Sequence, residues 1–134
     1  MNDVIEEIQQ LYTQYNVNLL KASNLGADVP DIADVTTRQV VINTNSKYTD
    51  QLPFRMTHEL MHIVHSNITS QRMVAYHNYD VKNIEEKTAN KEAIKLLWRL
   101  YSSTTDELNW VKFMECFGIP GFLENETLEI INSK

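Results

Sequence analysis

The chain has 134 residues, of which 43% are hydrophobic and 22% charged, and its formal net charge is −6 at pH 7. This length and composition predict one globular domain over residues 1–134, without a nucleic acid as direct ligand, because an acidic protein repels phosphate backbones. There is no apolar run of about 20 residues that could span a bilayer, no secretory signal pattern and one cysteine, which together favour a cytoplasmic protein.

The first half of the chain predicts a helix followed by a small sheet. Apolar residues from Val4 to Tyr15 recur every three or four positions, which is typical of an amphipathic helix. Short apolar runs at 17–20, 32–35 and 39–43 then predict three strands, the last two joined by a turn.

The second half predicts helices. One is expected at about 51–65, with Pro53 in the first turn, where proline is tolerated. Residues 66–80 are mostly polar and predict a long loop, which in a compact domain is often functional. Helical patterns follow at about 81–102, 105–117 and 121–132, with a glycine and proline break at 118–121. The expected fold is α+β, a small three-stranded sheet packed on a helical bundle, with residues 1–103 as the core and 104–134 as a C-terminal helical pair.

The helix expected at 51–65 contains His58-Glu59-Leu60-Met61-His62, the pattern H-E-x-x-H. Two helical histidines four residues apart lie on one face, about 5–6 Å apart, so both imidazoles can bind one Zn²⁺. Glu59 is rotated about 100° from His58, so its carboxylate can act as a base on water without binding the ion. This set of side chains is typical of zinc peptidases. A solvated helix face that happens to carry the same residues is the alternative interpretation.

A catalytic zinc ion usually has three protein ligands, and the candidates for the third are His65, His77, Glu85 and Glu86. His65 lies about 10 Å along the helix axis from His58, which is too far for one ion. Glu86 heads a stripe of small and apolar residues, whereas Glu85 aligns with polar ones. A buried carboxylate requires a cation, so we predict Glu86 as the ligand. A helix-start carboxylate stabilised by the dipole, and His77 as the ligand, both stay open.

Other polar residues are candidates for supporting roles. Asn90 lies one helical turn after Glu86 and could accept a hydrogen bond from the second nitrogen of His58 or His62. An ordinary interior or surface position for Asn90 is equally consistent with the sequence. In the loop expected at 66–80, the candidates to stabilise an oxyanion are Tyr76 and His77, followed by Arg72 and Tyr79.

Three segments together resemble the ImmA/IrrE metallopeptidase family: Gln39-Val40-Val41-Ile42-Asn43, then Phe54-Arg55-Met56-Thr57-His58-Glu59-Leu60-Met61-His62, then Glu86-Lys87-Thr88-Ala89-Asn90. The resemblance covers roughly residues 15–100 and implies a compact zincin-like fold with the H-E-x-x-H helix at its centre. It implies that His58, His62 and Glu86 bind Zn²⁺ and that Glu59 is the general base. Family members typically come from bacteria, phages or mobile elements, and several cleave or control a helix-turn-helix repressor.

We therefore expect a zinc-dependent intracellular endopeptidase that cleaves or inactivates a helix-turn-helix repressor. The alternative is a non-proteolytic antirepressor, a binding module that sequesters the repressor. A third hypothesis is a deformylase-like amidohydrolase with a cysteine ligand. The only cysteine, Cys116, is instead expected to be a buried structural thiol. Two histidines and a carboxylate also suit Mn²⁺ or Fe²⁺.

Overall fold

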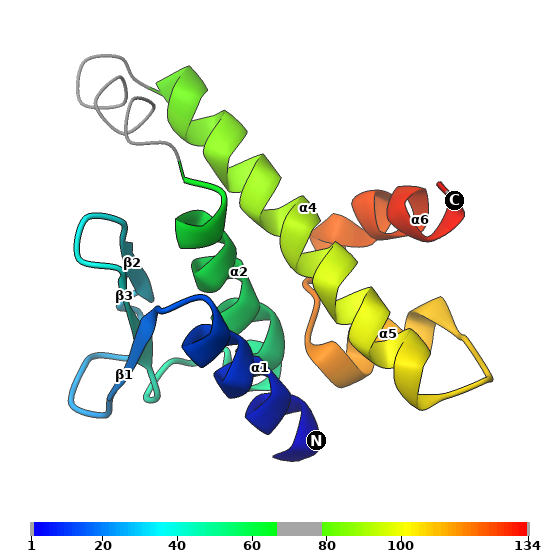
Figure 1. Cartoon of the computed structure of the whole chain (residues 1–134), viewed down its shortest axis with the longest axis horizontal. Coiled ribbons are helices and arrows are strands. Elements are labelled where there is room, and N and C mark those ends of the chain that lie inside the picture. The colour runs from blue at the N-terminus through cyan, green and yellow to red at the C-terminus, as the bar shows by residue number, and fades with distance from the viewer. Residues whose placement is uncertain (1, 67–78, 134) are drawn as a thin grey trace.

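The computed structural model describes residues 2–66 and 79–133, and within them it has five α-helices and a three-stranded mixed sheet (Figure 1). The predicted α+β class, with a small sheet packed on helices, is confirmed. The helices are α1 (Asn2–Gln14), α2 (Leu52–Val64), α4 (Tyr79–Thr104), α5 (Trp110–Phe117) and α6 (Glu124–Asn132). The strands are β1 (Asn18–Ala22), β2 (Ile32–Asp34) and β3 (Gln39–Asn43). Two short 3₁₀ helices, η1 (Thr49–Gln51) and η2 (Gly121–Leu123), precede α2 and α6.

The sheet has the strand order β1-β3-β2, with β1 parallel and β2 antiparallel to β3. Val40 and Ile42 of β3 are buried, because alternate residues of a strand face the same side and this side packs on the helices. β2 ends at Asp34, whose carboxylate accepts hydrogen bonds from the backbone and hydroxyl of Thr36 and starts the turn into β3. Within the described residues, β2 pairs with β3 alone and is an edge strand.

Helix α2 lies between the sheet and α4 and forms the centre of the core (Figure 1). It begins with Pro53 in its first turn, as the sequence predicts. Its side chains Met56, Leu60 and Ile63 are almost fully buried, which places the opposite edge of the helix at the surface. The buried hydroxyl of Tyr12 in α1 donates a hydrogen bond to the Met56 carbonyl and so connects α1 to α2.

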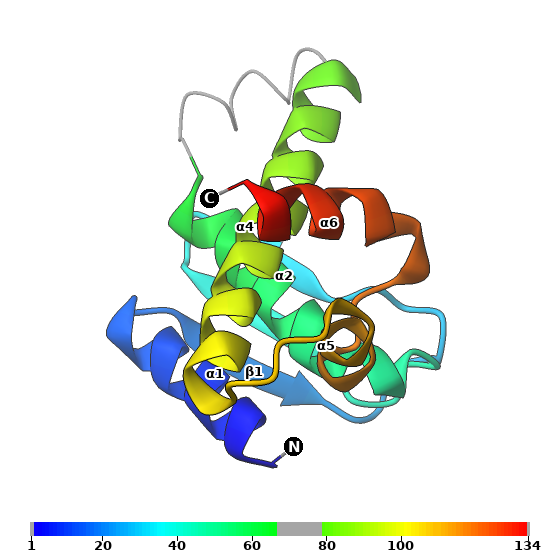
Figure 2. The same ribbon diagram turned by 90° about the vertical axis from the view of Figure 1, so that its right-hand side faces the viewer.

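The C-terminal helices α5 and α6 both pack on the long helix α4, and α6 crosses α4 on the side shown in Figure 2. The inner face of α5 packs its aromatic rings on α4, with the Trp98 and Phe113 ring centroids 4.9 Å apart. Helix α5 begins at residue 110, later than the predicted 105, because Asn109 caps it by accepting hydrogen bonds from the backbone N–H groups of Val111 and Lys112. None of the helices in the described part of the chain is both long and apolar enough to cross a bilayer.

Candidate metal centre

Three side chains from two helices converge at the surface between α2 and α4. Glu86 of α4 lies with Oε1 3.1 Å from Nε2 of His58 and Oε2 3.1 Å from Nε2 of His62, both on α2. The two Nε2 atoms are 3.2 Å apart, and the imidazole rings are nearly perpendicular. One ligand atom from each residue lies within 4.8 Å of the other two. His58, His62 and Glu86 therefore form a group that could hold a metal ion.

The environment of this group favours a positive charge at its centre. The His58 and His62 side chains are 14% and 17% exposed, whereas Glu86 is 44% exposed. Hydrogen bonds from His58 and His62 hold the pKa of the Glu86 carboxyl well below its ordinary value. Burial lowers the pKa of His62, but the hydrogen bond to Glu86 and the charges of nearby glutamates outweigh it, so this pKa is raised. Because metal ligands must be deprotonated, a divalent cation would compete with protons for these side chains.

Glu59 of α2 lies next to the three ligand candidates and lines the same groove as they do. Burial raises the pKa of its carboxyl to about 7, and the nearby charges of His58 and His62 partly oppose this shift. Such a value suits a group that accepts and returns a proton near neutral pH. Glu59 is thus a partly buried carboxyl beside a candidate metal centre, and its raised pKa would suit a general base.

The candidate ligands and Glu59 open into a groove of about 510 Å³. One wall is the segment from Pro30 to Val35, which includes the edge strand β2, and the other is formed by α2 and the start of α4. His62 also borders a smaller cavity of about 170 Å³ on its far side, with Met61 and Ala89 in its wall. The candidate metal centre is therefore accessible from a groove large enough to admit several atoms of a ligand.

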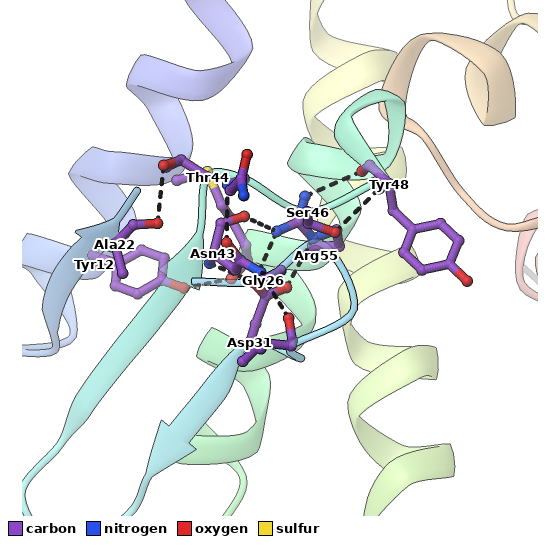
Figure 3. Close-up of polar contacts among 12 residues, drawn as sticks. Tyr12, Ala22, Gly26, Asp31, Asn43, Thr44, Ser46, Tyr48 and Arg55 are labelled. Carbon is purple, nitrogen blue, oxygen red and sulfur yellow. Dashed lines mark hydrogen bonds and ion pairs between the residues drawn. The ribbon is translucent and has the colours of Figure 1, made fainter. Parts of the chain in front are cut away.

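A buried ion pair fixes the wall of the groove to α2 (Figure 3). Arg55, three residues before His58, donates from Nε and Nη2 to the two Asp31 carboxylate oxygens, each at 2.8 Å, and these side chains are only 11% and 9% exposed. Nη2 also donates to the Asn43 carbonyl, and the Asn43 side chain donates to the carbonyls of Gly26 and Val29. The network joins the end of β3, the segment before β2 and the first turns of α2.

Sequence reasoning missed Asp31, although Arg55 gave a signal for it. An arginine on the helix that carries the histidines, one turn before them, requires an anionic partner if it is buried. The partner is 24 residues away along the chain, and sequence spacing alone does not single it out among the acidic residues.

Two further candidates from the sequence, His65 and Asn90, lie away from the ligand group. His65 faces Glu92, with Nε2 3.6 Å from a carboxylate oxygen, in agreement with its rejection as a ligand. Asn90 borders the space between α4 and α6, and among the described residues it forms no hydrogen bond with either imidazole. The buried Nδ1 of His58 has no hydrogen-bond partner in that part of the chain, so Asn90 does not support this ligand.

Two further predictions concern Cys116 and the loop. The prediction of a buried Cys116 is wrong, because the thiol is exposed while Phe113 and Phe117 of the same helix face the core. A position one residue from Phe117 is rotated about 100° away from it, toward solvent. Arg72, Tyr76, His77 and the side chain of Tyr79 lie outside the described residues.

Comparisons with protein-family models, with curated proteins and with solved structures found no match to this chain. The fold and the site define an α+β protein with a His-His-Glu group able to hold a metal ion. The geometry of this group is the basis on which we infer a function.

Proposed function

We propose that the protein is a zinc-dependent peptidase in which His58, His62 and Glu86 hold the ion and Glu59 is the general base. The observation that carries this proposal is the convergence of the three ligand atoms within 4.8 Å, beside the partly buried carboxyl of Glu59, whose pKa is raised to about 7. Two imidazoles and one carboxylate are a ligand set of catalytic zinc sites, which keep a further position open.

The donor atoms fit a divalent ion that prefers nitrogen and oxygen ligands, since two Nε2 atoms and a carboxylate face one point. When bound, Zn²⁺ supplies Lewis acidity and makes water acidic enough to react near neutral pH. Glu59 would accept the proton of the attacking water on its carboxylate and then deliver it to the nitrogen of the leaving amine. The helical turn of α2 between His58 and His62 fixes the positions of both imidazole rings.

The shape of the groove supports a polypeptide substrate. An extended peptide can add as a further strand to an exposed sheet edge, and the edge strand β2 forms part of the groove wall. The resemblance to the ImmA/IrrE metallopeptidases supports a zincin-like architecture and an intracellular protein substrate, with a helix-turn-helix repressor as the substrate class. In the alternative function the same groove binds the repressor without cutting it.

The test compares Glu59→Gln with Glu85→Gln, because both carboxylates line the groove and only Glu59 is assigned as the base. Each zinc-loaded variant is incubated with a fluorogenic peptide library and with a helix-turn-helix repressor. We expect Glu59→Gln to retain zinc and to lose peptide cleavage by about 100-fold or more, the size of a general-base contribution. Glu85→Gln should cleave like the unchanged protein.

Two results would contradict this assignment. Undiminished cleavage by Glu59→Gln would remove Glu59 as the base. A stable complex between the unchanged protein and the repressor, without fragments and without cleavage of any library peptide, would favour the binding function.

A further inference from the structure

A second groove lies away from the metal centre, between α5, the turn after it and η1; we call it the α5 groove. Its volume is about 460 Å³. Figure 2 shows α5 beside the start of α2. The lining is apolar along α5 and the following turn, at Trp110, Val111, Met114, Ile119 and Pro120, and acidic at Asp50, Glu115 and Glu124. None of these residues belongs to the proposed peptidase site.

The floor of the α5 groove is fixed by close backbone packing. Gly118 ends α5 with φ 69°, and a Cβ at this position would come within 2.3 Å of the Asp50 carbonyl oxygen. Phe113 and Phe117 hold the inner face of α5 in the core. The groove is therefore pre-formed, and binding of a ligand would not include the free-energy cost of ordering it.

Exposed apolar side chains lie in the lining of the α5 groove and close to lining residues in the sequence. Val111, in its lining, is 46% exposed. Leu108, just before α5, is 51% exposed, and Phe122 in η2 is 78% exposed. Single exposed apolar side chains are ordinary, but an apolar groove with acidic residues at its rim is typical of an interaction surface.

Charge indicates what the α5 groove would bind. Residues 104–134 contain six acidic and two basic side chains, so they hold −4 of the total charge of −6. Glu115 and Glu124 in the lining are exposed and form no ion pair within the described part of the chain. Such a surface repels nucleic acids and anionic membranes and attracts cations.

We propose that the α5 groove docks a basic segment of a partner protein, with apolar side chains against Val111 and Met114 and lysine or arginine side chains beside Glu115 and Glu124. Electrostatic complementarity of this kind selects a partner and speeds its association. Docking here does not require that the metal centre be catalytic, because the two sites share no residue.

The test measures binding of a fluorescent amphipathic peptide of leucine and lysine, about four helical turns long. Glu115→Lys should weaken binding about fivefold or more, because an ion pair is replaced by a like-charge contact. Glu6→Lys is the matched control: it makes the same change of charge at an exposed position on α1. It should change the affinity much less. Val111→Ser, also at an exposed position, should weaken binding without unfolding the chain, as checked by circular dichroism.

A second measurement locates the peptide. Cys116 is the only cysteine, is exposed and lies on α5, so a benzophenone attached to it should cross-link the bound peptide. Equal losses for Glu115→Lys and Glu6→Lys would overturn the proposal, as would absence of binding at about millimolar peptide, a range in which binding is only about 4 kcal/mol. Self-association of the protein that Val111→Glu abolishes would assign the groove to a second copy of the chain and would also overturn it.

Discussion

Glu86 is the residue on which the candidate metal centre depends, because it is the one ligand candidate that does not come from α2. Its neighbour Glu85 also borders the groove, but the three-residue ligand group contains Glu86. Helical periodicity predicts different directions for these two carboxylates, since adjacent helical residues point about 100° apart. The burial expected for Glu86 from its sequence neighbours is not found, because its side chain is 44% exposed.

Replacing Glu86 should therefore remove the metal, and replacing Glu85 should not. We expect Glu86→Ala to lower zinc affinity by more than the 10–100-fold typical of outer-shell partners, because a direct ligand is lost. Elemental analysis after dialysis against a zinc buffer gives the metal content of each variant. Unchanged content in Glu86→Ala would show that the third ligand lies elsewhere.

Protonation at the same site should make the metal-free protein less stable as pH rises from about 5 to about 8. The pKa of Glu59 is about 7 in the folded protein against 4.5 ordinarily, and the pKa of His62 is also raised. Both groups bind protons more readily when folded, so their contribution to stability is present at low pH and is lost as pH rises through these values. The lowered pKa of Glu86 acts in the opposite sense only below about its ordinary value of 4.5.

The measurement is urea unfolding with a chelator present, at several pH values. Glu59→Gln should flatten the decline, which for this group amounts to about 3 kcal/mol at most, at about 1.4 kcal/mol per pKa unit. Glu85→Gln should flatten it less, because the charge of Glu85 helps to raise the pKa of His62 but does not contribute to that of Glu59. A stability that increases over this pH range would show that the burial of Glu59 does not control the titration.

Asn90 shows where residue-scale prediction stops. Its helical face relative to Glu86 is predictable, but four residues advance the chain by about 6 Å, which moves the side chain away from the imidazoles and toward α6. The distance between α2 and α4 at the level of Asn90 depends on how the helices pack, and the periodicity of the sequence does not predict it.

At the scale of elements, the ion pair between Arg55 and Asp31 holds the groove wall in place. The end of β3, the segment before β2 and the first turns of α2 meet there through one guanidinium group and one carboxylate (Figure 3). Local patterns predict the strands and α2 separately. Their junction requires a pairing over 24 residues that local patterns do not contain.

Asp31→Ala should cost about 3–5 kcal/mol of the free energy of unfolding, because it leaves a buried guanidinium group without its partner. The exposed pair of Lys47 and Asp28 gives the matched control, with side chains 54% and 83% exposed. Asp28→Ala should cost much less, because an ion pair between exposed side chains contributes little to stability. Chemical denaturation of both variants makes the comparison, and equal losses would contradict a special role for the buried pair.

At the scale of the whole molecule, the sequence predicts three strands and the helices around them but not how they are arranged. The parallel pairing of β1 with β3, and the position of β2 on the far side of β3, follow from long-range packing. The start of α5 shifts for a similar reason, because Asn109 both caps α5 and donates its backbone N–H to the Tyr101 hydroxyl of α4.

The fold as a whole should be stabilised by the proposed ion. A ligand that binds only the folded chain raises stability by about 2.7 kcal/mol at a concentration 100 times its dissociation constant. We expect zinc to raise the thermal midpoint of the protein and to leave that of His58→Ala or Glu86→Ala nearly unchanged. Differential scanning calorimetry with and without zinc measures this, and an equal rise in all three proteins would indicate binding elsewhere.

The ligand candidates come from α2 and α4, which are separated in the chain by the residues from 65 to 78. An ion bound by both helices would stabilise only the folded chain, in which α2 and α4 are packed together. In a cell starved of zinc, a larger share of the chains would then open and be exposed to proteolysis. The amount of this protein, and not only its activity, would follow the supply of the metal.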